Sequence, residues 1–560
     1  MDDRYPVVYV RGYAGGPAGI DTAVDDAFYG FNKGSTVVRV GGDGEPLFHQ
    51  FESPLLRLMI DEGYDLIVRG DQHATLQRAR ANSLDPASIW VYRFYDLHSR
   101  TFGGANPDVF DLRAAALGLY DFIELIRDRV HGRPPVYLVA HSMGGLVCRS
   151  MLQTVCGTPR EDGAVRDAGP DTVAKLLTMG TPHGGIETRF ALADLLNEHV
   201  GIFGSEMFAR ANMHEFLAPA AQDTGDYDPQ VMPEEALPSD RAFCVVGTNP
   251  SDYGLARKAI GVKSDGLVRI ENAYVKGAPR AFVHRAHSGS YGLVNSEEAY
   301  QNLRRFLFAK WRVRVHLVGV DFTHEDSLAG LSLEQLRQRL ARLEGGAEFD
   351  RPDLDSFWQA DVQVTVRGLP VILHEQSVDK HCPIQLTEEQ LRRRIAALTA
   401  GADLTDTDTA DTPVPLASVY LLGKARFNRD RSRASSTTHP GPVPRDPRAA
   451  PDSGLSRYAL RMRVFRLTET GGFLGMGGHL EQVADWEDSL IVDVGPAGDD
   501  GLVAWARWAS EIPGPNASYD PSGTPPLDFP GWVAEVPLPR AARDGVLGDR
   551  ARLRLEITEA

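Results

Sequence analysis

Cysteine is scarce in this sequence: a chain of 560 residues contains four, Cys148, Cys156, Cys244 and Cys382. No two of them form a CxxC pair, and none stands near histidines at the spacing of a zinc site. So few cysteines cannot form the disulfide framework of a small secreted protein, and we expect free, mostly buried thiols. Stability must instead come from hydrophobic cores, for which a hydrophobic content of 42% is sufficient.

Long apolar runs and an excess of positive charge are also missing. No stretch reaches the roughly 20 apolar residues that a membrane-spanning helix needs. The formal net charge is -17, which argues against a nucleic-acid-binding surface. The opening stretch MDDRYPVVYV has neither the basic nor the apolar region of a signal peptide. These absences predict a cytoplasmic protein without a nucleic-acid partner, although a secreted form that had already lost its signal peptide would look the same.

Residues 1–312 show the pattern of an α/β domain. Short apolar segments bounded by Gly, Pro, Asn or Asp alternate with amphipathic helical patterns, as buried parallel strands and their crossover helices do. The alternation predicts a mostly parallel sheet with helices on both faces. The expected strands are Pro6–Val10, Ile89–Phe94, Val136–Val139, Val173–Met179, Ala242–Val246 and Arg280–Val283.

Residues 313–560 have a different texture, made of short runs in which apolar and polar residues alternate. This pattern predicts a β-rich second domain, with a sandwich as the expected form. Two segments within it, 331–347 and 386–402, align without gaps, and each begins with the spacing of a helix capping box. The acidic stretch 403–411 follows the second copy; we interpret it as a solvated loop, with calcium binding as the alternative.

The second domain also contains five tryptophans. Trp505 and Trp508 stand three apart in a strand pattern and should therefore point to opposite faces. One of them is then available to anchor a large substrate or to pack against the first domain. We interpret this domain as an accessory that positions large substrates and takes no part in the chemical step.

A serine stands at the end of the most clearly buried strand pattern. The stretch PPVYLVAHSMGGLVCRSMLQ places Ser142 between an apolar strand and a helical pattern, with Ala140 two residues before it and Gly144 two residues after. Small residues at those positions are what a nucleophile elbow requires, because strand and helix come too close there for larger side chains. The alternative is a plain turn that ends the strand. We interpret Ser142 as a nucleophile.

A serine nucleophile needs a base, and the base needs an acid to orient it. In chains built around such an elbow, the acid and the histidine follow the serine in that order. Asp265 lies in the turn-forming stretch KSDGLV and is the first choice for the acid, with Asp252 as the alternative. His287 follows the last strand in a polar loop and is the first choice for the base. His284, which we expect to be packed within the strand pattern, is the alternative, and His141 is expected to be structural.

The oxyanion of the transition state needs hydrogen-bond donors. One is the backbone N–H of Met143, directly after the nucleophile. The other is expected from the glycine-rich loop RGYAGG after the first strand, with Tyr13 as the first choice and Ala14 as the second. A nearby segment, Ser35–Phe51, has the pattern of a hairpin.

The segment 186–240 interrupts the alternation of strands and helices and is rich in apolar residues. An insert at this place in the chain can cover the nucleophile and line the space beside it. We interpret it as a substrate cap, with Phe190, Phe208 and Phe216 as substrate-binding residues. The alternative is an insert that only packs against the sheet.

The stretches RGYAGG, AHSMGG, GTPHGG and SDGLV, with a late AHSGS, together resemble the α/β-hydrolase superfamily of serine lipases and esterases. They are most similar to the branch that contains bacterial lipases, lecithin:cholesterol acyltransferase-like proteins and the GPI inositol-deacylases. The resemblance covers about the first 310 residues, and it departs from many of these lipases where Arg11-Gly12 replaces their His-Gly. It implies an α/β-hydrolase fold, a triad of Ser142, Asp265 and His287, and no metal or organic cofactor.

The sequence therefore predicts a serine hydrolase that acts on carboxylic esters, with lipid or bulky esters as the expected substrates. An acyl-enzyme would form on Ser142 and be released by water. Two alternatives stay open at this point. One is an acyltransferase that uses the same triad, and the other is a non-catalytic α/β scaffold that binds a partner.

Overall fold

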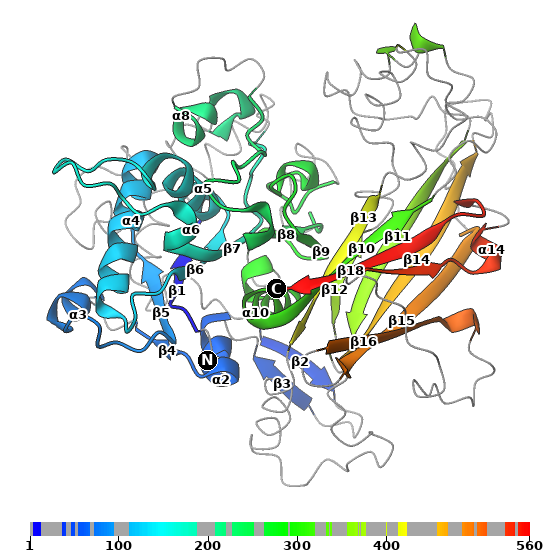
Figure 1. Ribbon diagram of the computed structural model, residues 1–560, viewed down its shortest axis with the longest axis horizontal. Coiled ribbons are helices and arrows are strands. Elements are labelled where there is room, and N and C mark those ends of the chain that lie inside the picture. The colour runs from blue at the N-terminus through cyan, green and yellow to red at the C-terminus, as the bar shows by residue number, and fades with distance from the viewer. Residues whose placement is uncertain are drawn as a thin grey trace. The chain divides into compact units, whose positions relative to one another are not determined.

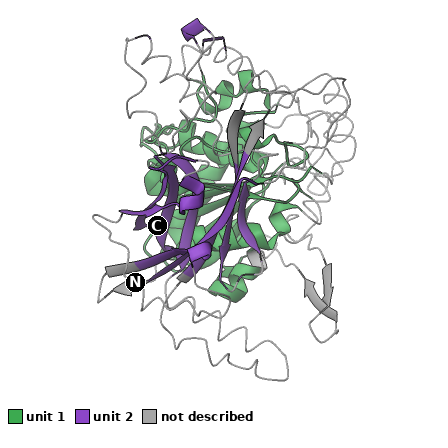
Figure 2. Ribbon diagram, turned by 90° about the vertical axis from the view of Figure 1, so that its right-hand side faces the viewer, with its two compact units in different colours: residues 1–308, 428–439 green, residues 309–427, 440–560 purple. Residues whose placement is uncertain are grey.

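A computed structural model shows two compact units: Met1–Phe308 with Asn428–His439, and Ala309–Phe427 with Pro440–Ala560. Figure 2 draws the two units in different colours. The structure describes residues 4–12, 36–40, 46–50, 54–67, 72–94, 111–186, 208–219, 227–250, 263–288, 292–319, 332–334, 337–338, 356–367, 369, 371–376, 399, 413–422, 456–468, 484–497, 501–511, 533–543 and 547–560.

Seven described strands of the first unit form one parallel sheet, in the order β4-β5-β1-β6-β7-β8-β9 (Figure 1). β1, β5 and β8 are buried along their whole length, and β6, β7 and β9 at all but one residue each, as expected for strands covered on both faces. The observed bounds lie close to those expected from the sequence, and β4 is an additional short strand. They are β1 (Val7–Val10), β4 (Asp65–Leu66), β5 (Ser88–Tyr92), β6 (Val136–His141), β7 (Val173–Met179), β8 (Ala242–Gly247) and β9 (Arg280–Val283).

Helices connect these strands. Those described in the first unit are α2 (Pro54–Glu62), α3 (Gln72–Arg78), α4 (Leu112–Arg129), α5 (Met143–Ser150), α6 (Gly169–Thr172), α8 (His214–Leu217) and α10 (Glu297–Phe308). A π-helical stretch, Met151–Val155, follows α5 directly. In addition, β2 (Thr36–Val40) and β3 (Pro46–Gln50) pair antiparallel, which is the hairpin expected between residues 35 and 51.

Helices cover both faces of the parallel sheet. Val7 is in register with Ile89 on one side and with Tyr137 on the other, so Tyr137 and Ile89 point to the same face. Trp90, the next residue along β5, must then point to the opposite face. Phe122 of α4 packs against Trp90, whereas Phe308 of α10 packs against Tyr137. The α4 and α10 helices therefore lie on opposite faces.

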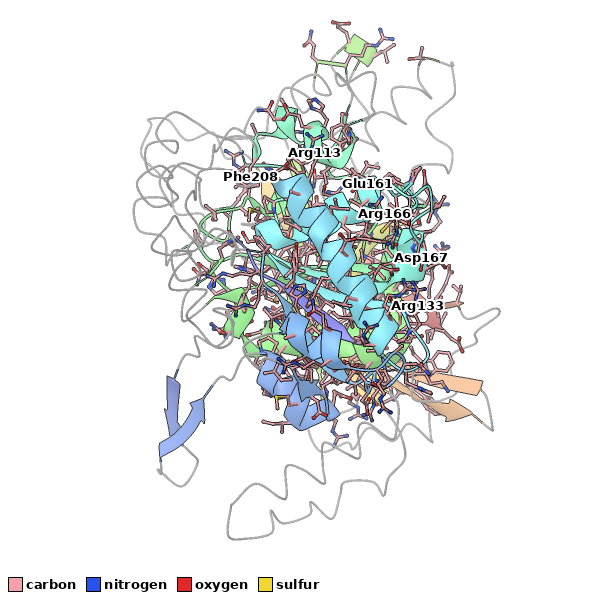
Figure 3. All side chains as sticks on the ribbon, turned by 90° about the vertical axis from the view of Figure 1, so that its left-hand side faces the viewer. Arg113, Arg133, Glu161, Arg166, Asp167 and Phe208 are labelled. Carbon is pink, nitrogen blue, oxygen red and sulfur yellow. The ribbon has the colours of Figure 1, made fainter. Side chains whose placement is uncertain are left out.

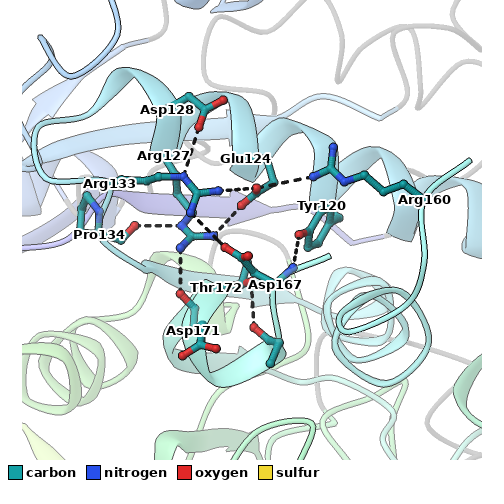
Figure 4. A network of polar contacts seen from close by, with 11 residues as sticks. Tyr120, Glu124, Arg127, Asp128, Arg133, Pro134, Arg160, Asp167, Asp171 and Thr172 are labelled. Atoms are coloured by element: carbon teal, nitrogen blue, oxygen red, sulfur yellow. Dashed lines mark hydrogen bonds and ion pairs between the residues drawn. The ribbon is translucent and has the colours of Figure 1, made fainter. Parts of the chain in front are cut away.

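An ion-pair network fastens the C-terminal half of α4 to the chain before β7; Figure 3 labels some of its side chains, and Figure 4 shows it from close by. Asp167 accepts hydrogen bonds from Arg127 (2.9 Å) and Arg133 (3.1 Å). Glu124 accepts from the same two guanidinium groups, at 2.5 and 2.7 Å. Two carboxylates shared by two arginines form a network. Such a network contributes more to the free energy of unfolding than isolated surface ion pairs do.

The second unit contains two antiparallel sheets. The described strands of one are ordered β13-β10-β18-β17, and those of the other β12-β11-β14-β15-β16. Both sheets contribute side chains to one hydrophobic core, as in a sandwich. The strands are β10 (Ala309–Val318), β11 (Ser356–Val366), β12 (Ile372–Gln376), β13 (Val414–Leu422), β14 (Ser456–Thr468), β15 (Trp486–Ala497), β16 (Gly501–Trp508), β17 (Val533–Pro537) and β18 (Arg552–Glu559), with the short helix α14 (Arg540–Ala542).

The expected architecture is confirmed: a parallel sheet with helices on both faces precedes a β-rich unit. The two similar segments, 331–347 and 386–402, lie largely outside the described residues, and the acidic stretch 403–411 lies wholly outside them. The helical and calcium interpretations of these segments therefore stay predictions. Within the described part of the chain, the helices are all too short or too polar to cross a membrane.

The core of the sandwich depends on Trp508. Its ring is 1% exposed and packs edge-on against Trp486, with ring centroids 5.6 Å apart. Its indole N–H donates to the carbonyl of Pro537, which lies on β17 in the other sheet (2.8 Å). Trp508 therefore connects the two sheets, whereas Trp505 is only half-buried, as expected for the opposite face of β16.

We predict that Trp508→Ala lowers the free energy of unfolding of the second unit by about 3 to 5 kcal/mol, because it leaves a large cavity and an unpaired carbonyl. Urea unfolding followed by circular dichroism measures the loss. Trp505→Ala, on the other face of the same strand, is the matched control and should cost clearly less. Equal losses in the two variants would contradict the assignment of Trp508 to the shared core.

Candidate active site

Ser142 occupies a strained turn between β6 and α5. Its φ is 53° and its ψ is -128°, a conformation that residues with a side chain rarely adopt. Three hydrogen bonds hold it there. The N–H of Ser142 donates to Met179 O (2.9 Å), and Ser142 O accepts from Thr181 Oγ1 (2.8 Å) and from the N–H of Gly145 (3.0 Å). This geometry is that of a nucleophile elbow, which lifts the serine hydroxyl from the end of the strand.

Glycines surround the turn because backbone passes close to it. A Cβ on Gly144 would lie 2.3 Å from the carbonyl oxygen of Val10, and a Cβ on Gly12 would lie 2.6 Å from the Cβ of Ser142. Neither distance is compatible with a side chain. Ala140, which stands where many elbows have glycine, is fully buried within β6. The small residues around Ser142 in the sequence predict a close approach of backbone. The structure has this approach between Gly144 and Val10.

His287 lies against Ser142 and Asp265. Its Nε2 is 2.9 Å from Ser142 Oγ, and its Nδ1 is 2.8 Å from Asp265 Oδ2. Because a carboxylate only accepts, Nδ1–H donates to Asp265, and Nε2 is left to accept from the serine hydroxyl. The structure thus brings together the three side chains expected from the sequence, although Ser142 and His287 are 145 residues apart.

Asp265 is held rigidly in the turn before Gly266. Its Oδ1 accepts from the N–H groups of Leu267 (3.0 Å) and Val268 (2.7 Å), which leaves Oδ2 for the imidazole. The carboxylate is completely buried, and the φ of Gly266 is 100°, which only glycine adopts readily. The Asp-Gly turn seen in the sequence is therefore what aims the acid at the base.

The alternatives for acid and base have different outcomes. Asp252 lies outside the described residues. The expectation that His284 is packed in a strand is wrong: β9 ends at Val283, and His284 is exposed in the bend that follows. His287, at 3% exposure, is the histidine that reaches Ser142.

Only part of the expected oxyanion and substrate residues can be located. Met143 is the first residue of α5, where a helix leaves its N–H groups without partners inside the helix. The role of its N–H as an oxyanion donor stays a prediction. Tyr13, Ala14 and Phe190 lie outside the described residues, and their roles stay predictions.

Phe208 and Phe216 are described, and both are buried. The carbonyl of Phe208 accepts from the N–H of Ile186 (2.8 Å), directly after the GTPHGG stretch. The carbonyl of Phe216, on α8, accepts from Ser150 Oγ at the far end of α5 (2.8 Å). In the view of Figure 3, Phe208 lies toward the N-terminal end of α4, away from the ion-pair network. Of the two, Phe208 is the one connected to the segment that surrounds the serine.

The GTPHGG stretch, to which the sequence assigned no role, contacts all three residues. Gly180 follows β7 with a φ of 56°, and a Cβ there would lie 3.0 Å from both Asp265 Oδ2 and His287 Nδ1. Thr181 donates to the carbonyl of Ser142. No signal within the stretch locates these residues: they lie against the residue after β6 only because β7 runs parallel beside β6.

Arg149 is fully buried on α5, and the partners of its Nη atoms in the described part of the chain include carbonyl oxygens but no carboxylate. Its Nη1 donates to Pro229 O (2.6 Å) and its Nη2 to Val231 O (3.0 Å). Burial lowers the pKa of this guanidinium to about 10, so it stays charged at neutral pH. Arg149 thereby ties the helix that follows Ser142 to the end of the predicted cap segment.

His141 is buried next to His287. Its Nε2 lies 2.9 Å from the carbonyl oxygen of His287, and the two rings are 5.0 Å apart. Burial, followed by the proximity of His287 and Arg11, lowers the pKa of His141 to about 3. His141 is therefore neutral near pH 7, in agreement with the structural role expected for it. The described residues contain no group of three or more His, Cys, Asp or Glu side chains placed to hold a metal ion.

The low pKa of His141 predicts a pH-dependent stability. Between the pKa of about 3 in the folded chain and about 6.5 in the unfolded chain, the unfolded chain binds more protons. The free energy of unfolding should therefore fall with decreasing pH across this window, by about 1.4 kcal/mol per pH unit from this residue. His141→Gln should remove that share of the slope in urea unfolding measured from about pH 6 to pH 4. The exposed His284→Gln is the control, and a slope unchanged in His141→Gln would contradict the prediction.

Comparison with known proteins gives likeness of fold only. No family model matches the chain, and no curated protein is similar in sequence. One similar solved structure is the propeptide form of a Bacillus licheniformis lipase, with 12% identity over 89% of this chain and 95% of that chain and a TM-score of 0.29. A Staphylococcus hyicus lipase has 13% identity over 55% of this chain and 94% of that chain, with a TM-score of 0.25. A Legionella pneumophila phospholipase in complex with thio-NAD has 12% identity over 54% of this chain and 58% of that chain, with a TM-score of 0.28. The chain is thus similar in fold to structures described as lipases and a phospholipase, at identities and TM-scores that support no conclusion about its chemistry.

Proposed function

We propose that this chain is a serine hydrolase that cleaves carboxylic esters through an acyl-enzyme on Ser142. One observation carries the proposal: a strained serine, a histidine and a buried carboxylate form a continuous hydrogen-bonded chain at 2.9 and 2.8 Å. A turn serine without a chemical role would need neither the strain nor a histidine oriented by a carboxylate. A non-catalytic scaffold gives no reason to bury these three groups together.

The proposed reaction begins with proton transfer. His287 Nε2 takes the proton of the Ser142 hydroxyl while Oγ attacks the ester carbonyl carbon. Asp265 stabilises the imidazolium that forms, and the N–H of Met143 donates to the developing oxyanion, with a second donor proposed from Tyr13. The imidazolium then protonates the leaving alcohol, and the acyl group stays on Ser142. Water then attacks the acyl carbon while His287 takes its proton. The bond between the acyl carbon and Ser142 Oγ breaks, the imidazolium returns the proton to Oγ, and the acid is released.

We expect Ser142→Ala to reduce turnover by roughly three to six orders of magnitude, because nucleophile and base act as a unit. The measurement is the rate of hydrolysis of a series of p-nitrophenyl esters of increasing acyl length, together with labelling by a fluorophosphonate probe. Ser150→Ala is the matched control. That serine lies on the same helix but donates its hydroxyl to Phe216 O, so the variant should still be labelled.

Retention of more than about a tenth of the wild-type rate by Ser142→Ala on every ester that the wild type hydrolyses would overturn the assignment. Equal labelling of wild type and Ser142→Ala would do the same, because the probe reacts with an activated serine.

The proposed substrates are esters with large apolar acyl groups. The described part of the segment 186–240 contains buried apolar side chains, among them Phe208, Met213 and Phe216. Its backbone accepts hydrogen bonds from the N–H of Ile186 and from Ser150 on α5. Phe208 is the strongest candidate for contact with the acyl chain, because its backbone pairs with Ile186. Phe216 belongs to α8, whose backbone is bound to the far end of α5.

We predict that Phe208→Ala shifts the preferred acyl length, measured as kcat/KM across the p-nitrophenyl ester series, by about tenfold between short and long chains. Phe216→Ala should mainly lower thermal stability and leave the acyl profile close to that of the wild type. Unchanged profiles in both folded variants would favour a segment that only packs against the sheet.

A further inference from the structure

The backbone of His287 is fixed on both sides of its Cα. Its N–H donates to the carbonyl of Asp265 (2.9 Å). Its carbonyl lies 2.9 Å from Nε2 of His141. Since a carbonyl only accepts, His141 must carry its proton on Nε2 and donate it to His287. Two hydrogen bonds therefore hold the peptide groups that flank the imidazole facing Ser142.

The donor to this carbonyl comes from the strand that carries the serine. His141 is the last residue of β6, and Ser142 follows it directly. The β6 strand lies between β1 and β7 and is buried along nearly its whole length, so its end is among the most rigid parts of the unit. The loop of His287 is a less regular element, because it follows β9 as a bend. The His141 hydrogen bond thus ties that loop to the rigid strand end one residue from Ser142.

The tie is short and specific. Ser142 and His141 are neighbours in sequence. His287 is hydrogen-bonded to Ser142 through its side chain and to His141 through its backbone carbonyl. If the carbonyl of His287 moves, the imidazole moves with it. A second contact, the ion pair of Arg285 with Glu298 on α10 (2.9 Å), restrains the loop from another side, but it is partly exposed and lies two residues earlier.

We propose that His141 is a positioning residue that sets the distance between base and nucleophile, through donation of its Nε2–H to the carbonyl of His287. This inference rests on the proposed function of Ser142 and His287. It assigns His141 no contact with substrate and no proton transfer. Because attack requires reacting groups at near-contact distance, a displacement of about 1 Å is sufficient to lower the rate by up to about a hundredfold.

The test compares two amides that differ by one methylene. In His141→Gln, the side-chain NH2 can reach the place of Nε2 and donate to the same carbonyl. In His141→Asn, the NH2 group stops near the place of Nδ1 and cannot. Both variants remove the ring and its titration, and both keep a polar, neutral side chain. Differences between them therefore report the position of the donor.

We expect His141→Asn to lower kcat on a soluble p-nitrophenyl ester by about 10- to 100-fold with little change in KM, and to slow fluorophosphonate labelling of Ser142 by a similar factor. His141→Gln should keep kcat within about threefold of the wild type. Thermal unfolding is measured for both variants. A merely structural role would affect the stability of the two alike and would not separate kcat from KM.

Equal kcat values in His141→Asn and His141→Gln, with both variants folded, would overturn the inference. If His141→Asn does not fold, a loss of more than about tenfold in kcat of folded His141→Gln would also overturn it, because the donor is present there. Failure of the proposed function looks different: the wild type itself would then show no Ser142 labelling and no hydrolysis of any ester.

Discussion

The strained turn at Ser142 is the constraint on which the rest of the first unit depends. A non-glycine residue in this conformation costs on the order of 1–3 kcal/mol, and it persists only where its surroundings hold it. Here Met179, Thr181 and Gly145 satisfy both peptide groups of the serine. The turn also requires that Val10 approach Gly144 at a distance that excludes a side chain. The stretches RGYAGG, AHSMGG and GTPHGG thus each place a glycine where the backbone passes too close to its neighbours for a side chain.

Parallel strand order turns this local requirement into a site. The C-terminal ends of β1, β6, β7, β8 and β9 lie at one edge of the sheet. Close to each of these ends lies Ser142, Asp265 or His287, or a residue that packs against one of them. Gly12 follows β1, Ser142 follows β6 and Gly180 follows β7. At the end of β8, a Cβ on Gly247 would lie 2.7 Å from the Cβ of Asp265. The sheet therefore gathers at one edge groups that are far apart in the sequence.

Features that depend on residues close together in the sequence could be predicted, whereas features that depend on contacts between distant segments could not. The buried strands were predictable because each depends on its own run of apolar residues, and β7 and β9 have the expected bounds. Ser142 and Asp265 were predictable because an elbow and an Asp-Gly turn have local residue requirements. His287 was preferred because it lies in the polar loop after β9, whereas His284 was wrongly expected to be packed: it is exposed directly after the strand.

The functions of Thr181, Gly180 and Arg149 could not be predicted because they depend on contacts between segments. Thr181 has a role only when β7 lies beside β6. Arg149 reads as an ordinary helix residue, yet it is buried and binds carbonyls some 80 residues away. Strand order in the sandwich was equally inaccessible, since β10 pairs with β13 across about a hundred residues and with β18 across more than two hundred. Alternation predicts a strand but does not identify its partner.

Among the described residues, no carboxylate forms an ion pair with the buried guanidinium of Arg149. Its desolvation is therefore costly, which makes its placement informative. Its charge is met by carbonyl dipoles of Pro229 and Val231 and by the amide of Gln153, so the pKa is lowered but the group stays charged. The helix that begins at the strained serine is thereby fixed at both ends: Thr181 holds its start, and Arg149 holds its last turn. A nucleophile needs a support that does not yield when a substrate enters, and a rigid helix fastened to neighbouring backbone supplies it. The buried charge of Arg149 and the strained turn at Ser142 both lower the stability of the fold. In return, they hold the serine hydroxyl in a fixed position beside the imidazole of His287.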